Sequence, residues 1–253
     1  MKLSITLVCV LFLSNYSGSL AANTCDPNQG GQNYCCPAVG ASGIVTIAAY
    51  VQMIPPNAFN SCARLTSITF ATSHTLLIIA SQAFINCTAL TSIAIPNSVI
   101  SLGAVVFSSR TSLTTVTIGS SLRSIPDFTF YDCIKLRSIV IPNTVTSMGM
   151  YVFGACSALT SVTIGSGLTM LPDYAFYGCS SLTYIIIPKT VTTLGLGVFV
   201  SCTGLTSVTI DSGVKMLSNS TFFDCSALTS IVIPNTVTSM GTSVFCTHFC
   251  HCW

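Results

Sequence analysis

The chain has 253 residues, of which 51% are hydrophobic and only 6% are charged. It contains no glutamate, and its six acidic residues are aspartates scattered singly, so the sequence offers no evident carboxylate pair for general acid–base hydrolysis. The eight basic residues fall to seven once Lys2 is removed with the leader described below. This near balance of charge disfavours binding to nucleic acid or to anionic lipid.

Residues 1–21 have the pattern of a secretory signal peptide. Lys2 precedes an apolar run at residues 3–13, and small residues follow at 19–22. The apolar run is too short to span a bilayer comfortably, so we expect cleavage after Ala21 or Ala22 rather than retention as an anchor. The mature chain is therefore predicted to be exported and to contain no membrane span.

Residues 22–44 are predicted to form an N-terminal cap. The segment has no hydrophobic periodicity, and it carries Cys25, Cys35 and Cys36 among Pro, Asn, Gln and Gly residues. In an exported repeat protein, a cap braced by disulfides can cover the first turn. Three cysteines allow several pairings, so the sequence predicts disulfides without fixing their connectivity.

Residues 45–245 contain a repeated pattern marked by one phenylalanine in each repeat. The interval is 23 residues, except for a first interval of 25. The two extra residues fall between Phe70 and Leu76, which predicts a surface loop carrying His74, solvated and without a catalytic or metal-binding partner. The marker residues are Phe59, Phe84, Phe107, Phe130, Phe153, Phe176, Phe199, Phe222 and Phe245.

The sequence predicts one short strand in every repeat. In alternate repeats it also predicts one short helical segment. The pattern Leu-x-x-Ile-x-Ile at residues 136–141 alternates near the period of a β-strand, and Pro142 then ends the strand because it lacks a backbone donor. Pro126 and Asp127 precede the marker Phe130, where proline and aspartate favour the first turn of a helix. We therefore expect short α- or 3₁₀-helical turns opposite the strands.

The repeat resembles a known family. Residues 136–156 read Leu-x-x-Ile-x-Ile-Pro-x-x-Val-x-x-Met-Gly-x-x-x-Phe-x-x-Cys, which is similar to the BspA-like leucine-rich repeats found in surface proteins of bacteria and protists. The resemblance covers residues 45–245. It implies an α/β-type repeat solenoid, a right-handed leucine-rich-repeat coil with a parallel β-sheet on one face and short helical or 3₁₀ turns opposite. Members of the family are commonly linked with adhesion and cell-surface binding.

A cysteine lies three residues after most marker phenylalanines. Stacked strands about 4.8 Å apart would bring neighbouring cysteines within disulfide range, but side chains in one column point the same way, which defeats a bridge. We therefore predict a structural column of buried thiols rather than disulfides. Arg110 replaces the cysteine in one repeat, which would interrupt any metal or redox relay. The column comprises Cys62, Cys87, Cys133, Cys156, Cys179, Cys202 and Cys225.

Residues 246–253 form a tail rich in metal-ligating side chains: Cys246, His248, Cys250, His251 and Cys252. Their spacing matches no standard zinc motif, and an exported chain would oxidise its thiols. The preferred interpretation is therefore that Cys246, Cys250 and Cys252 form disulfides, with a metal site as the weaker alternative. Because no predicted strand follows Phe245, the last turn is expected to be poorly covered and to offer an end for self-association.

Serine and threonine dominate the outward positions of the predicted strands, which gives a nearly neutral hydroxyl surface. Arg137, Tyr184 and Ile186 depart from this pattern on repeats two apart, and Tyr and Arg are favoured at interfaces. We identify these three residues as ligand-binding candidates. The alternative is that the face consists only of good exposed strand formers.

Asn86 and Asn219 begin Asn-x-Ser/Thr sequons, so they are glycosylation candidates if the host is eukaryotic. No Ser-His-Asp set can be nominated, because two of the three histidines lie in the tail. Together these features predict a secreted or surface-exposed protein that needs no cofactor and has no catalytic activity. It would bind a protein or glycan ligand at a cell surface. The alternative function is a structural spacer or a self-assembling coat or matrix component.

Overall fold

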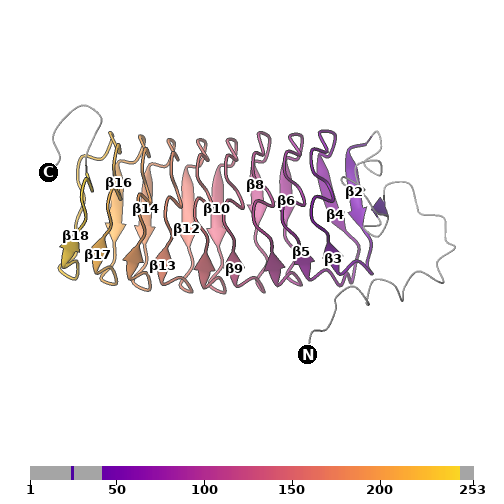
Figure 1. Cartoon of the computed structure of the whole chain (residues 1–253), viewed down its shortest axis with the longest axis horizontal. Helices are drawn as coiled ribbons and strands as arrows, with labels where there is room; N and C mark the ends of the chain where they lie inside the picture. The colour runs from indigo at the N-terminus through magenta and orange to yellow at the C-terminus, as the bar shows by residue number, and fades with distance from the viewer. Residues whose placement is uncertain (1–23, 26–41, 246–253) are drawn as a thin grey trace.

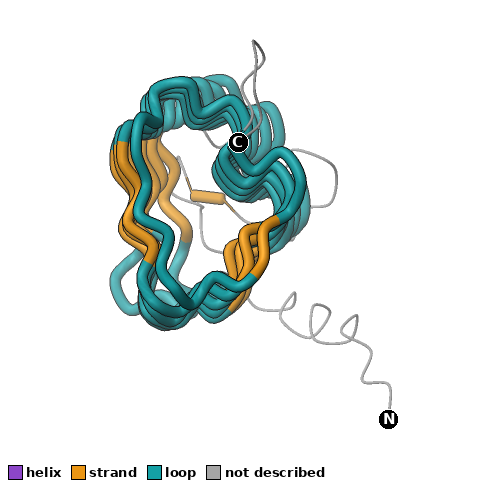
Figure 2. The backbone as a smooth tube through the Cα atoms, turned by 90° about the vertical axis from the view of Figure 1, so that its left-hand side faces the viewer, coloured by secondary structure: helices purple, strands orange, loops and turns teal. Residues whose placement is uncertain are grey.

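The computed structural model describes residues 24–25 and 42–245. These residues form an elongated stack of coils that runs from one end of the molecule to the other (Figure 1). Viewed along the stack, successive turns superimpose on one outline (Figure 2). The predicted repeat solenoid is therefore confirmed.

One row of strands, which we call the long-strand face, follows the predicted parallel sheet, and its hydrogen-bonded ladders fall into three groups. Neighbouring strands belong to consecutive turns, and all of their pairings are parallel. β1 (Thr24–Cys25) pairs with the first of them and extends the face at its N-terminal end. The strands are β2 (Ile44–Ile47), β4 (Ser67–Phe70), β6 (Ser92–Ala94), β8 (Thr115–Thr117), β10 (Ser138–Ile141), β12 (Ser161–Ile164), β14 (Tyr184–Ile187) and β16 (Ser207–Ile210).

A second row of parallel strands, the short-strand face, was not predicted. Each of its strands has only two residues, which is too short to produce a periodic hydrophobic pattern. Both rows are visible in Figure 2 on different sides of the coil. The strands are β3 (Met53–Ile54), β5 (Ile78–Ile79), β7 (Ser101–Leu102), β9 (Ser124–Ile125), β11 (Ser147–Met148), β13 (Met170–Leu171), β15 (Thr193–Leu194), β17 (Met216–Leu217) and β18 (Ser239–Met240).

The register of the strands follows the repeat length. Ser138 pairs with Ser161, an offset of 23 residues, and the same offset recurs along the long-strand face. The pair Met53 and Ile78 has an offset of 25 residues. The two extra residues therefore lie between β4 and β5, in the loop that the sequence predicts.

The marker phenylalanines form the centre of the core. From Phe59 to Phe222 their side chains are fully buried. Rings of consecutive turns lie nearly parallel, with centroids 4.9–5.6 Å apart. Each turn thus covers the apolar side of the next, and stability depends on neighbouring turns rather than on any single one.

The prediction of short helical or 3₁₀ turns is wrong, because the described residues contain no helix. Around a marker phenylalanine the backbone enters the left-handed region twice, as at Phe128 (φ 53°) and Asp132 (φ 59°). Such residues interrupt a right-handed helix. The amides bond along the stack instead: Phe130 donates to the Val152 carbonyl at 2.9 Å, and Asp132 donates to the Gly154 carbonyl at 2.8 Å.

The last described turn is less well covered than the others, as expected. Val232 is 80% exposed and Met240 is 52% exposed. Ile231 and Ile233 are only partly buried, whereas their counterparts two turns earlier are buried. The long-strand face is reduced there to an isolated bridge between Thr209 and Val232.

Candidate functional site

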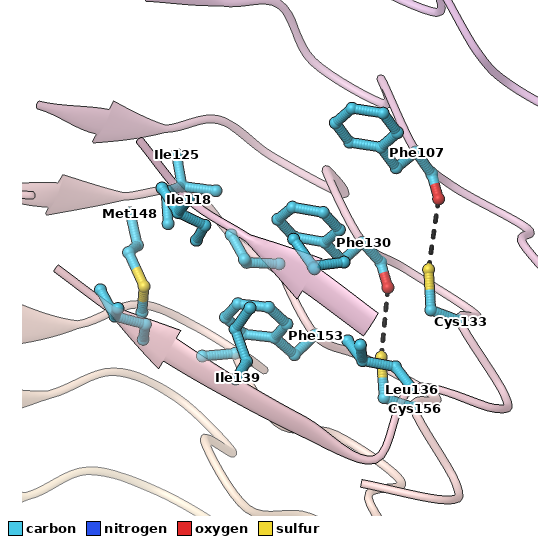
Figure 3. Packing of buried hydrophobic residues seen from close by; sticks show 14 of the residues in the cluster. Phe107, Ile118, Ile125, Phe130, Cys133, Leu136, Ile139, Met148, Phe153 and Cys156 are labelled. Atoms are coloured by element: carbon cyan, nitrogen blue, oxygen red, sulfur yellow. Dashed lines mark hydrogen bonds between the residues drawn. The ribbon is translucent and has the colours of Figure 1, made fainter. Parts of the chain in front are cut away.

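The cysteine column is a structural part of the coil. Each thiol donates a hydrogen bond to the carbonyl oxygen of the marker phenylalanine one turn earlier, as Cys133 does to Phe107 and Cys156 to Phe130, both at 3.2 Å (Figure 3). Burial raises the pKa of the Cys179 thiol to about 12. The Cys179 thiol is therefore a neutral donor, which suits it to packing rather than to nucleophilic chemistry. The prediction of free buried thiols is confirmed for Cys87, Cys133, Cys156, Cys179, Cys202 and Cys225.

Two positions depart from this column. Cys62, the first cysteine of the column, is disulfide-bonded, so the prediction of a free thiol is wrong at this position. Arg110 replaces a cysteine, and its side chain is fully buried. One guanidinium nitrogen lies 3.4 Å from the Val106 carbonyl oxygen, while the other two have no partner among the described residues. Burial lowers the pKa of Arg110 to about 10.

The threonines that directly precede strands of the long-strand face already form side-chain hydrogen bonds with the backbone. Their hydroxyls donate to carbonyl oxygens one turn earlier at 2.9–3.5 Å. A ligand would have to compete with these hydrogen bonds, so we assign these threonines a structural role. The threonines that make this bond are Thr66, Thr91, Thr114, Thr160 and Thr206.

The three predicted ligand-binding residues lie on one side of the coil. Tyr184 and Ile186 point outward from β14 and are 50% and 53% exposed. Arg137 is exposed directly before β10, and β12 lies between these two strands. Val140 in β10 is 60% exposed and adds an apolar side chain to the same face. The four residues, which we call the sheet-face patch, interrupt a surface of small hydroxyl side chains.

His74 is not the solvated, unpartnered histidine that the sequence predicts. It is half-buried, its Nδ1 lies 3.2 Å from the Ser98 hydroxyl, and its ring packs against Phe70 with 5.6 Å between centroids. The Ser98 hydroxyl also donates to the Leu76 carbonyl oxygen. Because that proton is already used, the pair lacks the arrangement in which a base activates a serine nucleophile.

A group of aromatic side chains that the sequence analysis missed lies on the connections from β9 to β10, from β11 to β12 and from β13 to β14. Phe128, Tyr151 and Tyr174 stack with ring centroids 5.2 and 4.7 Å apart. Tyr131 and Tyr177 pack edge-on against Tyr151 at 6.1 and 6.0 Å. We call these five residues the aromatic cluster. The 23-residue spacing of the stacked rings was the signal that could have revealed it.

The phenol groups of the aromatic cluster lie close to one another and are half-buried. Burial, and then the nearby phenol of Tyr174, raises the pKa of Tyr151. Tyr177, Tyr131 and the carboxylate of Asp173 act in the same direction. None of the four tyrosine hydroxyls has a hydrogen-bond partner in the part of the chain that the structure describes.

Two aspartates directly precede stacked rings of the cluster. The Oδ1 atom of Asp127 accepts a hydrogen bond from the Met150 amide at 2.8 Å. The Oδ1 atom of Asp173 accepts one from the Leu196 amide at 2.7 Å. Both carboxylates therefore link consecutive turns at the border of the aromatic surface.

Two segments of the chain, residues 42–159 and 123–250, match one family model, which describes the BspA type leucine-rich repeat region and accounts for six copies of the repeat. The chain belongs to this family. A search of curated protein sequences finds no match.

Solved structures of bacterial leucine-rich repeat proteins resemble this BspA-type chain. A protein from Eubacterium ventriosum is 20% identical, with a TM-score of 0.52 over 83% of this chain and 84% of that one. A T. pallidum leucine-rich repeat protein is 25% identical, with a TM-score of 0.51 over 80% and 74%. A leucine-rich cell surface protein from Faecalibacterium prausnitzii is 28% identical over 74% of this chain, with a TM-score of 0.49, and the match spans only 59% of its own length.

Both glycosylation candidates of the BspA-type chain are exposed. Asn86 lies in a turn with left-handed backbone (φ 58°). The Oδ1 atom of Asn219 accepts a hydrogen bond from the Thr242 amide at 2.9 Å. A glycan attached to the Nδ2 atom would leave that bond in place. Glycosylation stays a prediction at both positions.

The predicted cap and tail cysteines fall largely outside the described residues. This applies to Cys35 and Cys36 and to the metal candidates Cys246, His248, Cys250, His251 and Cys252, while only the backbone of Cys25 is described, in β1. Within the described ranges, no group of three His, Cys, Asp or Glu side chains could hold a metal ion. In the same ranges, no helix could cross a membrane.

Proposed function

We propose that this BspA-type repeat protein binds a protein or glycan ligand at a cell surface without catalysing a reaction. The sheet-face patch is the proposed contact. Its support is one observation: Tyr184, Ile186 and Val140 are at least half exposed on a face where the neighbouring threonine hydroxyls bond to the backbone. Exposed Tyr and apolar side chains supply binding free energy that such threonines do not.

The test is a cell-binding assay with the full chain and patch variants. Tyr184→Ala and Ile186→Thr should each lower the affinity about tenfold, because truncated interface anchors lose on the order of 1–2 kcal/mol. Thr already occupies the position of Ile186 in the adjoining turns, so the fold should tolerate that change. Ser92→Ala, at an exposed position in β6 on the same face and two strands away from β10, serves as the matched control. Unchanged affinity in both patch variants contradicts the proposal.

Treating the target cells separates the two ligand classes. If the ligand is a protein, limited protease treatment of the cells abolishes binding and glycosidase treatment does not. If the ligand is a glycan, the reverse holds. Binding that survives both treatments contradicts the proposed ligand classes.

We also propose export, followed by display at the cell surface or release. The support is the signal-like segment at residues 1–21 and the cysteine-rich cap and tail. A non-reducing peptide map of material recovered from the medium or the cell surface tests both points. We expect a chain that begins at residue 22 or 23, with disulfides among Cys25, Cys35, Cys36, Cys62, Cys246, Cys250 and Cys252. A reduced intracellular chain that keeps residues 1–21 contradicts export.

Self-association is the second candidate function, favoured by the exposure of Val232 and Met240 in the last described turn. Uncovered strand positions at the end of a stack can pair with another copy. The size of the protein as a function of concentration distinguishes the two functions. Filaments that disappear in a Met240→Lys variant support assembly, whereas a monomer at all concentrations that still binds cells supports adhesion.

A further inference from the structure

The aromatic cluster is built at backbone positions that disfavour large side chains. Phe128, Tyr151 and Tyr174 have φ angles of 53°, 53° and 55°. Bulky residues are uncommon in this left-handed region. At the same position, other turns carry residues such as Gly197 and Ser220. The coil can therefore form without aromatic side chains here.

The negative charges beside the cluster also exceed what the coil requires. In a later turn, Asn219 makes the same inter-turn hydrogen bond as Asp127 and Asp173, through an uncharged amide. A third aspartate, Asp132, directly follows Tyr131. Three of the six aspartates in the chain are thus sequence neighbours of cluster residues, and the bond to the backbone does not explain the charge of Asp127 and Asp173.

The central rings of the cluster are covered on their flat faces. The faces of Tyr151 are stacked between Phe128 and Tyr174. The ring of Tyr174 also packs against Gly197, where an added Cβ would lie 2.6 Å from a ring carbon. The phenol oxygens and the neighbouring carboxylates are therefore the groups that a basic ligand can contact.

From these three observations we infer that the aromatic cluster, with Asp127, Asp132 and Asp173, binds a basic protein segment that carries arginine or lysine side chains. Guanidinium and ammonium groups donate hydrogen bonds to phenol and carboxylate oxygens, and the opposite charges favour the encounter. A sugar ring would instead stack on an exposed aromatic face, and both faces of the central Tyr151 ring are covered. This surface differs from the sheet-face patch, so the inference stands independently of the proposed function.

Binding of a fluorescent hexa-arginine peptide to the full chain tests the inference. We expect measurable binding that weakens as salt is added, because salt screens the attraction between the carboxylates and the peptide. Asp127→Asn combined with Asp173→Asn should lower the affinity about tenfold and reduce its salt dependence. Tyr131→Phe combined with Tyr177→Phe should also weaken binding while keeping all five rings. Both double variants conserve side-chain size, and circular dichroism confirms that each is folded.

Two controls separate this surface from the rest of the molecule. Asp211→Asn removes a carboxylate outside the cluster, and Tyr184→Ala removes the main anchor of the sheet-face patch. Neither should change the binding of hexa-arginine. The inference is overturned if the Asp127→Asn, Asp173→Asn variant binds the peptide as tightly as the unmodified chain. It is equally overturned if a neutral N-acetylglucosamine tetrasaccharide, and not hexa-arginine, binds in a manner that depends on Tyr131 and Tyr177.

Discussion

The thiol of Cys179 donates a hydrogen bond of 3.2 Å to the carbonyl oxygen of Phe153, which lies one turn earlier in the coil. The same carbonyl accepts the amide of Cys156 at 3.3 Å. One oxygen thus holds together its own turn and the next. This relationship recurs along the column and explains why a small polar sulfur occupies a position surrounded by phenylalanine and leucine.

Replacing a column thiol should destabilise the coil. Cys179→Ala leaves a small cavity and removes a buried donor, so we expect the free energy of unfolding to fall by about 1–3 kcal/mol. Urea denaturation followed by circular dichroism measures the change. Thr163→Ala, at an exposed position, should stay within about 0.5 kcal/mol of the original chain. Equal stability of the two variants would show that neither the volume of the thiol nor its hydrogen bond stabilises the coil.

Stability should decrease at alkaline pH. Burial raises the pKa of Cys179 and of Cys225 to about 12, above the ordinary value of 9. Below pH 9 both thiols are protonated whether the chain is folded or unfolded. Between pH 9 and 12 the unfolded chain loses these protons and the folded chain keeps them, so the unfolded state is favoured. Each such thiol should remove up to about 1.4 kcal/mol per pH unit.

Urea denaturation of the full chain at pH 8 and at pH 10, under reducing conditions, measures this effect. The Cys179→Ala variant provides the comparison, because it has one buried thiol fewer. Its free energy of unfolding should fall less between the two pH values than that of the original chain. An identical fall in both proteins would mean that the Cys179 thiol does not contribute.

Replacing Arg110 by cysteine should stabilise the protein. Arg110 is fully buried, and two of its guanidinium nitrogens have no partner among the described residues. A cysteine there restores the column and removes a buried charge, which should raise the free energy of unfolding by about 1–3 kcal/mol. Denaturation of the reduced protein measures this. Arg137→Ser, at an exposed arginine, should have little effect, and a loss of stability in Arg110→Cys would show that the guanidinium has a stabilising partner.

The carboxylate of Asp173 should be replaceable by an amide but not by a methyl group. Asp173→Asn keeps the Oδ1 acceptor for the Leu196 amide, as Asn219 does for Thr242. Asp173→Ala removes it and should cost about 1 kcal/mol of stability. Thermal unfolding of the two variants provides the comparison. If the amide variant is as unstable as the alanine variant, the negative charge itself supports the fold.

The sequence by itself determined the parts of the structure that repeat. The 23-residue spacing of the marker phenylalanines required every turn to bury the same positions, so the stacked Phe130 and Phe153 and the buried thiols followed from periodicity. The parallel strands were implied by the resemblance to the BspA-like repeats. The outward positions of Tyr184 and Ile186 followed from strand alternation. These predictions hold because burial depends on a pattern that is local and many times repeated.

Only the tertiary structure decided how the turns bond to one another. Pro126 and Asp127 favour a helix locally, yet the amide of Phe130 finds its acceptor in the next turn, and left-handed residues on both sides of it close the coil without a helix. The partner of His74 lies 24 residues away, at Ser98, and the rings of Tyr131 and Tyr177 meet only through Tyr151. Such contacts depend on how neighbouring turns stack. They join residues that are far apart in the sequence, so no local pattern reveals them.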